Sequence, residues 1–197
     1  MQLNLNFENS PEIPLNLINF DNKPRELDRL PAECVITDIE TTGLNPARDS
    51  IIEISAIKIQ DDKIVSEFSS LINPDISLPP FISNLTSIDD SMVKNARKLK
   101  EVMFDYCNFI GCLPVVGHNI KFDLSFINAK LKHLYNTSLK NDYADTLYFA
   151  KKVYPALQSY KLSSLAHNLN LDTKNAHRAL FDCKMTYELF LDIKSKL

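Results

Sequence analysis

Glycine is scarce in this sequence of 197 residues: it occurs three times, where average usage of about 7% would give roughly fourteen. Tryptophan is absent, and no apolar run approaches the roughly 20 residues that a membrane-spanning helix needs. The N-terminal residues MQLNLNFENS lack the basic and then apolar layout of a secretory signal. These absences predict a soluble protein of the cytoplasm that has no membrane partner.

The cysteines also exclude some classes of protein. They are Cys34, Cys107, Cys112 and Cys183, and no two of them form a CxxC pair. This spacing argues against a zinc site and against a disulfide framework. Hydrophobic residues make up 45% of the chain, which is enough for one domain with its own core. The sequence therefore predicts an intracellular domain with reduced thiols.

The chain divides into two parts of different composition. Residues 1–33 carry four of the ten prolines and only short apolar runs, so they predict a loosely structured N-terminal extension. From residue 34 onward, β-rich segments come first and then alternate with segments of helical period. This order predicts a mixed α/β domain over residues 34–197.

Two acidic side chains stand at the end of the first β-rich segment, CVITDIE. Alternate residues of a strand point to the same face, so Asp38 and Glu40 project together. Two carboxylates so close repel each other, and the pair favours binding of a divalent cation. Oxygen ligands of this kind are typical of Mg²⁺ or Mn²⁺ rather than of zinc. Taken alone, such a pair is more often a solvated strand edge.

The other candidate side chains lie near predicted helix starts, where their ordinary roles are structural. Asp123 falls in the first turn of a helix that Asn119 is expected to cap, and His118 precedes that cap. His177 and Asp182 stand at the head of the last helix, and a histidine is suited to accept a proton near neutral pH. Taken one at a time, each of these residues has a plain structural explanation.

Together, the motifs follow one order: DIETTG, then HNIKFD with Asp123 placed 85 residues after Asp38, then HRALFD with five residues from His177 to Asp182. This set resembles the DEDDh family of 3′→5′ exonucleases, most closely the proofreading (epsilon) exonucleases of bacterial DNA polymerase III. The resemblance covers roughly residues 33–195. It implies a ribonuclease H-like fold, in which helices flank a mixed five-stranded sheet.

The resemblance also implies roles for the five residues. Asp38 would bridge two divalent ions, Mg²⁺ or Mn²⁺, about 4 Å apart. Glu40 and Asp182 would complete the site of the ion that activates water, and Asp123 would hold the second ion. His177 would be the general base that deprotonates the attacking water. The implied reaction releases nucleoside 5′-monophosphates from the 3′ end of DNA, in proofreading or repair.

The motif residues beside the metal ligands are expected to bind the substrate: Thr41, Thr42, Gly43, Leu44, His118 and Asn119. In this interpretation, backbone N–H groups from Thr41 to Gly43 hold the terminal nucleotide, and Leu44 acts as an apolar wedge against its base. For Thr42, a plain turn stabilised by its hydroxyl group is the preferred interpretation.

The three glycines gain meaning from these motifs. Gly43 closes DIETTG, and Gly117 ends the strand that precedes HNIKFD. At both places the backbone is expected to turn sharply or to approach a ligand closely. Gly111 is expected to end a helix.

The formal net charge of −3 at first argues against a polyanionic partner. The four carboxylates account for four negative charges, so the rest of the chain is formally +1, and two divalent ions would bring the loaded protein to +1. Binding of single-stranded 3′ ends is therefore expected to be weak and salt-sensitive. The resemblance to the polymerase III exonucleases favours DNA over RNA as the substrate.

Two alternatives stay open. The motifs do not specify the sugar, so an RNA 3′-trimming exonuclease resembling oligoribonuclease or ribonuclease T would use the same site. A non-catalytic polymerase or clamp adaptor would be expected to lose a metal ligand or the histidine, and all five residues are present. The segment from Gln2 to Phe7 resembles the short peptides that dock bacterial sliding clamps, although a β-strand explains its alternation equally well.

Overall fold

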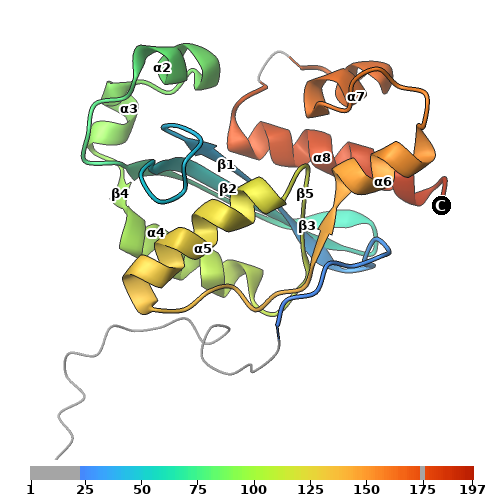
Figure 1. The fold of residues 1–197 in the computed structure, drawn as a ribbon, viewed down its shortest axis with the longest axis horizontal. Coiled ribbons are helices and arrows are strands. Elements are labelled where there is room, and N and C mark those ends of the chain that lie inside the picture. Colours follow the sequence, from blue (N-terminus) through green and yellow to red (C-terminus); the bar gives the residue numbers. More distant parts are fainter. Residues whose placement is uncertain (1–22, 174–175) are drawn as a thin grey trace, which may run out of the picture.

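The computed structural model describes residues 23–173 and 176–197, and it has one mixed sheet with helices on both faces (Figure 1). The strand order is β4-β3-β2-β1-β5-β6. The strands are β1 (Cys34–Thr41), β2 (Ile51–Gln60), β3 (Lys63–Asn73), β4 (Arg97–Lys98), β5 (Val115–Gly117) and β6 (Tyr143–Asp145). The helices are α2 (Pro80–Thr86), α3 (Asp90–Lys94), α4 (Leu99–Ile110), α5 (Lys121–Tyr135), α6 (Thr146–Val153), α7 (Leu162–Asn168) and α8 (Ala179–Lys194).

The mixed α/β fold is as predicted, but the described sheet has six strands and not five. Strands β1 to β3 form an antiparallel meander, and β5 and β6 add in parallel beside β1. The additional strand is β4, whose Arg97 and Lys98 pair with the end of β3. A strand of two residues leaves no periodic pattern in a sequence, so only the long strands could be expected.

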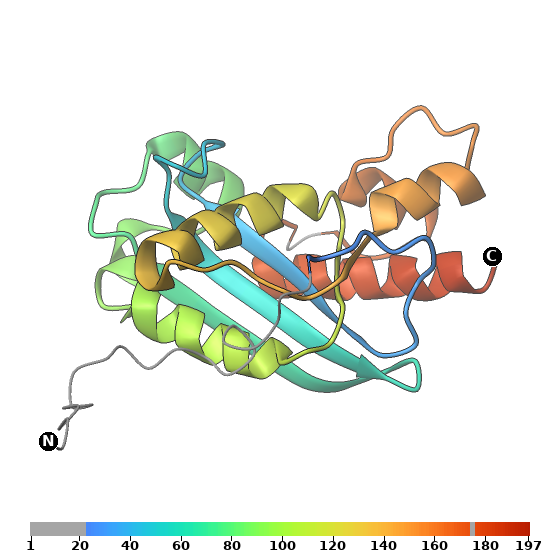
Figure 2. The same ribbon diagram turned by 60° about the horizontal axis from the view of Figure 1, so that its bottom comes forward.

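Two apolar cores lie on opposite faces of the sheet. Val35 and Ile39 of β1 belong to the core under α4 and α5, whereas Cys34 and Ile36 belong to the core under α6, α7 and α8. Figure 2 shows α4 and α5 together on one side of the sheet and α8 on the other. Because β1 alternates between two buried faces, its side chains are fixed from both sides.

Helix α5 lies where it was predicted, but its N-cap differs from the prediction. Its first residue is Lys121, and Ile120 holds the N-cap position without a side-chain hydrogen bond. Asn119 has a left-handed backbone with φ of 61°, whereas an N-cap residue typically has extended backbone, so the predicted Asn119 cap is wrong. The other local prediction is confirmed, because Gly111 follows α4 with φ of 54° and its N–H donates to the Cys107 carbonyl.

Part of the segment predicted to be loosely structured packs against the sheet. Glu26 forms a parallel bridge to Tyr143 of β6, and the N–H of Leu27 donates to the Tyr143 carbonyl at 2.7 Å. Arg25 pairs with Asp142 at 2.7 Å on the surface. The predicted clamp-docking segment, from Gln2 to Phe7, lies outside the described residues.

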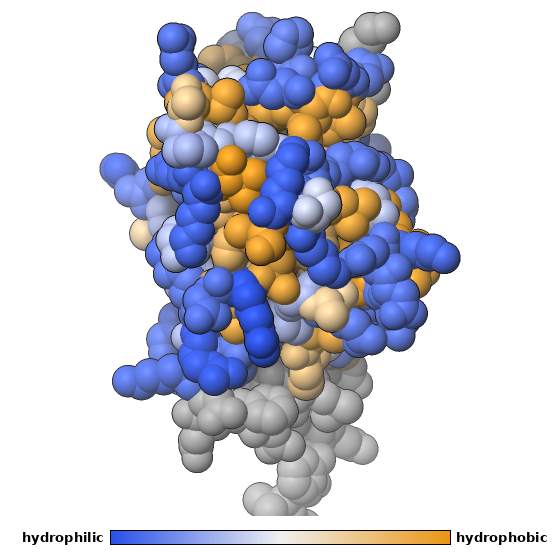
Figure 3. Space-filling model, turned by 90° about the vertical axis from the view of Figure 1, so that its right-hand side faces the viewer, coloured by the Kyte–Doolittle hydropathy of each residue, from blue (hydrophilic) through white to orange (hydrophobic). Residues whose placement is uncertain are grey.

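The end of the molecule that faces the viewer in Figure 3 is largely hydrophilic, with apolar areas exposed between the polar side chains. None of the described helices combines the length and the apolar character that crossing a bilayer demands.

Candidate active site

A cleft of about 860 Å³ lies at the carboxyl end of β1 and at the starts of α5 and α8. In a sheet of this type, ligands bind where the carboxyl ends of neighbouring parallel strands meet. The cleft is lined by all four carboxylates and both histidines of the sequence motifs: Asp38, Glu40, Asp123, Asp182, His118 and His177. Residues that are up to 144 positions apart in the chain therefore share one space.

Strand β1 and helix α5 form one side of the cleft. Asp38 and Glu40 point to the α8 face of the sheet, while Ile39 between them enters the opposite core. Asp123, in the first turn of α5, is buried, and its Oδ1 accepts a hydrogen bond from the Ile39 N–H at 3.1 Å. This contact ties the α5 carboxylate directly to the backbone between the two strand carboxylates.

Helix α8 and the residues before it form the other side. Asp182 Oδ2 accepts a hydrogen bond from the His177 N–H at 3.1 Å, and His177 itself is exposed with φ of 67°. Candidate ligand atoms of Glu40, His177 and Asp182 all lie within 4.8 Å of one another. Asp182 Oδ1 is buried and has no hydrogen-bond partner within the described part of the chain. A buried acceptor without a donor, beside further carboxylates, fits the position of a cation.

Burial is the main reason why these carboxyl groups hold their protons more tightly than usual. It raises the pKa of Glu40 to about 8, of Asp123 to about 8 and of Asp182 to about 7. The pKa of Asp38 also lies well above its ordinary value, because of burial first and repulsion from Asp123 second. A bound divalent cation would favour the ionised forms instead, so the donor set fits a metal ion.

A buried ion pair beneath the site was not predicted. Glu53 of β2 lies opposite Glu40 in the β1–β2 register, and its side chain is 3% exposed. It accepts hydrogen bonds from Arg178 Nε at 3.1 Å, from Arg178 Nη2 at 2.9 Å and from the Ala179 N–H at 3.0 Å. Glu53 therefore holds the first turn of α8, the helix that carries Asp182.

The loop after β1 is closed by its own hydrogen bonds. The Thr42 N–H donates to the Ser50 carbonyl at 2.9 Å, and the Thr42 hydroxyl accepts from the Ser50 N–H at 2.9 Å. The Thr42 N–H is thus engaged within the loop, and the structural role preferred for Thr42 fits this geometry. The Thr41 hydroxyl donates to the Gly43 carbonyl at 2.6 Å. Leu44 lines the cleft and is 83% exposed, as a wedge residue requires.

Two glycines allow close packing beside the cleft. A Cβ on Gly43 would lie 2.4 Å from the Asp49 carboxylate, and a Cβ on Gly117 would lie 2.5 Å from Ile120 Cδ1 and 3.1 Å from the Thr37 carbonyl. Neither is among the residues with positive φ. The close approach predicted at both positions is therefore to neighbouring protein atoms.

His118 connects the cleft to the segment between α6 and α7. Its Nε2 donates to the Tyr160 carbonyl at 2.7 Å, and its Nδ1 lies 3.0 Å from the Thr146 hydroxyl. Burial lowers its pKa, which favours a neutral ring whose Nδ1 accepts from Thr146. Both ring nitrogens are thus engaged within the protein. The exposed Asn119 lines the cleft, and its N–H donates to Asp145 at 2.9 Å.

Comparison with known proteins identifies the family. The model of the Exonuclease family (RNase_T) matches residues 35–190. The chain is 33% identical over 163 residues to DNA polymerase III subunit epsilon of Aquifex aeolicus, a match that covers 83% of this chain and 81% of that protein. The chain therefore belongs to the exonuclease family, as the motifs predicted.

Other relatives are much longer. DNA polymerase III PolC-type of Caldanaerobacter subterraneus is 42% identical over 168 residues, which are 85% of this chain and 12% of that protein. The chain thus spans about one eighth of such a relative.

Solved structures agree with the fold. Exonuclease X in complex with 5′ overhanging duplex DNA has a TM-score of 0.68 at 27% identity, covering 82% of this chain and 90% of the other. Exonuclease I of E. coli in complex with a dA16 oligonucleotide has a TM-score of 0.73 at 18% identity, covering 84% of this chain and 41% of the other. The sheet and its flanking helices are those of the ribonuclease H-like fold.

Proposed function

We propose that the chain hydrolyses DNA from its 3′ end and releases nucleoside 5′-monophosphates. The observation that carries this proposal is the collection of four carboxylates and one exposed histidine in a single cleft, where the buried Asp182 Oδ1 has no hydrogen-bond donor among residues 23–173 and 176–197. Relatives named as DNA polymerase III proteins support a role in replication proofreading or repair, and hence a cytoplasmic location. Docking to a polymerase or clamp through Gln2 to Phe7 stays a prediction.

Two Mg²⁺ or Mn²⁺ ions would suit the donor set, because hard cations prefer carboxylate oxygens. The residues that would hold them are Asp38, Glu40, Asp123 and Asp182. When bound, such ions lower the pKa of water and offset charge on the reacting phosphate. The fixed strand and helix positions of the four carboxylates would orient the scissile phosphate over the cleft floor.

His177 would take the proton of the attacking water. Its ring reaches within 4.8 Å of the Glu40 and Asp182 oxygens, yet the side chain is exposed and can pass a proton to solvent. The hydrogen bond from its backbone N–H to Asp182 fixes the residue beside the carboxylates.

The deciding experiment follows the shortening of 5′-labelled substrates: single-stranded DNA, a duplex with a mismatched 3′ end, and RNA. With Mg²⁺ or Mn²⁺ we expect a ladder of shorter DNA products and free 5′-mononucleotides, and with EDTA no reaction. Faster shortening of RNA than of DNA would favour the RNA-trimming alternative. No hydrolysis of any substrate with either metal would contradict the proposal and favour an adaptor.

Two variants of α8 distinguish loss of a proposed metal ligand from loss of a surface charge on the same helix. Asp182→Asn should lower the rate by about 10³-fold or more, because a bound metal supplies several kcal/mol of transition-state stabilisation. Glu188→Gln removes an exposed charge from the same helix and should leave the rate unchanged. Similar rates for the two variants would remove Asp182 from the proposed site.

A further inference from the structure

The cleft has walls of opposite charge. Its floor carries the four carboxylates, whereas the side formed by α6 and the start of α7 carries Lys151 and Lys161. Both lysines are exposed, and within the described part of the chain neither of them forms an ion pair. By contrast, Lys121, Lys184 and Lys194 are each paired with an acidic side chain elsewhere on the surface. The two cleft lysines are therefore available to an anionic ligand.

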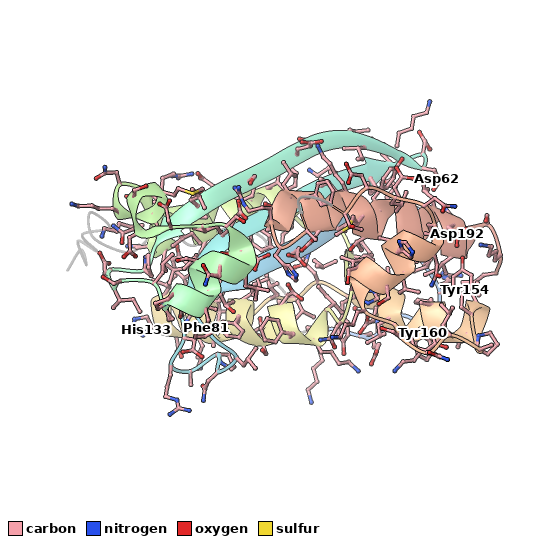
Figure 4. All side chains as sticks on the ribbon, turned by 90° about the horizontal axis from the view of Figure 1, so that it is seen from above. Asp62, Phe81, His133, Tyr154, Tyr160 and Asp192 are labelled. Carbon is pink, nitrogen blue, oxygen red and sulfur yellow. The ribbon has the colours of Figure 1, made fainter. Side chains whose placement is uncertain are left out.

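The fold holds both lysines beside one anchor, Tyr160. The Tyr160 carbonyl accepts from His118 Nε2, and its hydroxyl donates to the Tyr154 carbonyl at 2.5 Å. Figure 4 shows the two tyrosines at the same end of the molecule. Lys161 is the next residue in the chain, and Lys151 Nζ lies 5.9 Å from the centroid of the Tyr160 ring. Tyr160 is thus hydrogen-bonded through both its carbonyl and its hydroxyl group, and Lys151 and Lys161 lie beside it at the cleft.

The chemistry of the proposed reaction identifies the anion, so this inference rests on the proposed function. A nucleotide removed from a 3′ end contributes one phosphate, the scissile one, and that phosphate belongs over the acidic floor. Every further phosphate of the strand lies on the 5′ side of the cleaved bond. Cations on another wall of the same cleft therefore face the part of the strand that the enzyme retains.

We propose that Lys151 and Lys161 bind the sugar–phosphate backbone of the retained strand, 5′ of the scissile bond. Contacts of this kind position a strand without reading its bases. They act through charge, so they strengthen binding at low salt and weaken as salt rises. The subsite should therefore control KM for long substrates and leave the chemical step unchanged.

Two substrates separate the subsite from the reaction centre. One is a single-stranded oligothymidylate of about twelve nucleotides, long enough to reach beyond the site. The other is the p-nitrophenyl ester of thymidine 5′-monophosphate, which has one phosphodiester and no retained strand. The Lys151→Gln/Lys161→Gln double variant should raise KM for the oligonucleotide about tenfold, with kcat within about twofold of wild type. It should hydrolyse the ester like wild type.

Salt dependence gives an independent measure. The slope of log kcat/KM against log salt for the oligonucleotide should become shallower by about 0.7 for each lysine removed. Lys152→Gln is the matched control, because Lys152 lies on the same helix, is exposed and does not line the cleft. The Lys151→Arg/Lys161→Arg variant keeps both charges and should keep the wild-type KM.

The outcomes distinguish the subsite from the proposed function. If wild type hydrolyses both substrates and the double variant keeps the wild-type KM, the subsite is overturned while the function stands. An equal rise of KM for both substrates would overturn the subsite as well. So would a rise of KM for the oligonucleotide in Lys152→Gln as large as that in the double variant. If folded wild type hydrolyses neither substrate, the proposed function fails, and this inference fails with it.

Discussion

The two sides of the acidic cleft are held in place by different means. On the strand side, Asp38 and Glu40 belong to β1, which pairs with β2 along its whole length and with β5 at Val35 and Ile36, and Asp123 is tied to the Ile39 N–H. On the helix side, Asp182 and His177 lie around the start of α8, which Glu53 holds through its buried carboxylate. One side thus depends on the backbone of the sheet, and the other on one side-chain network.

This difference locates where function and stability are coupled. Asp38 and Glu40 lie in the ladder of hydrogen bonds between β1 and β2. The loss of one nearby contact therefore leaves the other hydrogen bonds of the ladder to hold the strand in place. Among the described residues, the start of α8 is held by the contacts of Glu53 with Arg178 and Ala179, so we expect one substitution there to move His177 relative to the proposed metal ligands. We therefore expect substitutions in the Glu53 network to affect both the stability of the protein and the position of His177.

The largest expected effect tests the exposed end of the helix side. His177→Ala should lower kcat by about 10²- to 10⁴-fold, the range typical of a lost general base, and leave thermal stability unchanged. Single-turnover hydrolysis of labelled DNA measures the rate, and His133→Ala, an exposed histidine of α5, is the control. A loss of less than tenfold would place the base elsewhere.

The next effect tests the network that holds the helix side. Arg178→Met leaves the Glu53 carboxylate buried without its partner and should lower the free energy of unfolding by about 2 kcal/mol. This is less than for a fully buried pair, because the Arg178 side chain is 37% exposed. Lys184 lies on the same helix, α8, and forms an exposed ion pair with Glu67 of β3. Lys184→Met should lower the free energy of unfolding by less than about 1 kcal/mol.

Urea unfolding measures both variants. The Glu53→Leu/Arg178→Met double variant should regain much of the lost stability, since no buried charge is left unpaired. Equal unfolding free energies for Arg178→Met and Lys184→Met would contradict the special role of the buried pair.

The last prediction concerns carboxylates on both sides of the cleft and the stability of the metal-free protein at different pH values. Without metal, the pKa values of Glu40, Asp123 and Asp182 are raised to about 8, 8 and 7, so the folded chain keeps protons that the unfolded chain releases near pH 4. Stability should therefore fall as pH rises from about 4 to about 8 and then level off. In EDTA, the melting temperature should be lower at pH 8 than at pH 5.5.

Added Mn²⁺ should raise the melting temperature more at pH 8 than at pH 5.5, because the ligands must be deprotonated to bind. The Asp123→Asn/Asp182→Asn variant should show a flatter pH dependence in EDTA. A metal-free melting temperature that rises between these pH values would contradict the raised pKa values.

Much of the fold and the motif residues of the site could be predicted, because each motif lies at the end of a strand or the start of a helix and places its candidate residues within a few positions of one another. Longer contacts could not. Glu53 and Arg178 are 125 residues apart, and β2 is buried on both faces, so alternation in IIEIS does not distinguish Glu53 as a partner. Lys151 and Lys161 line the cleft beside Tyr160, whose carbonyl accepts a hydrogen bond from His118, 42 residues earlier in the chain.

The sequence preferences of helix starts also failed to predict the role of Asn119. Its residue type favours a cap, but the chain turns through a left-handed conformation there, and its N–H binds Asp145 instead. Local preference was overruled by a contact with a strand that follows more than twenty residues later.

The segment around Glu26 has a consequence for association between copies of this chain. By pairing with β6, it covers an edge of the sheet that would otherwise present free N–H and C=O groups to the strand of another molecule. These residues precede the region matched by the family model, which begins at residue 35. We therefore expect protection of this edge against pairing with another molecule to depend on a stretch of chain that takes no part in the proposed chemistry.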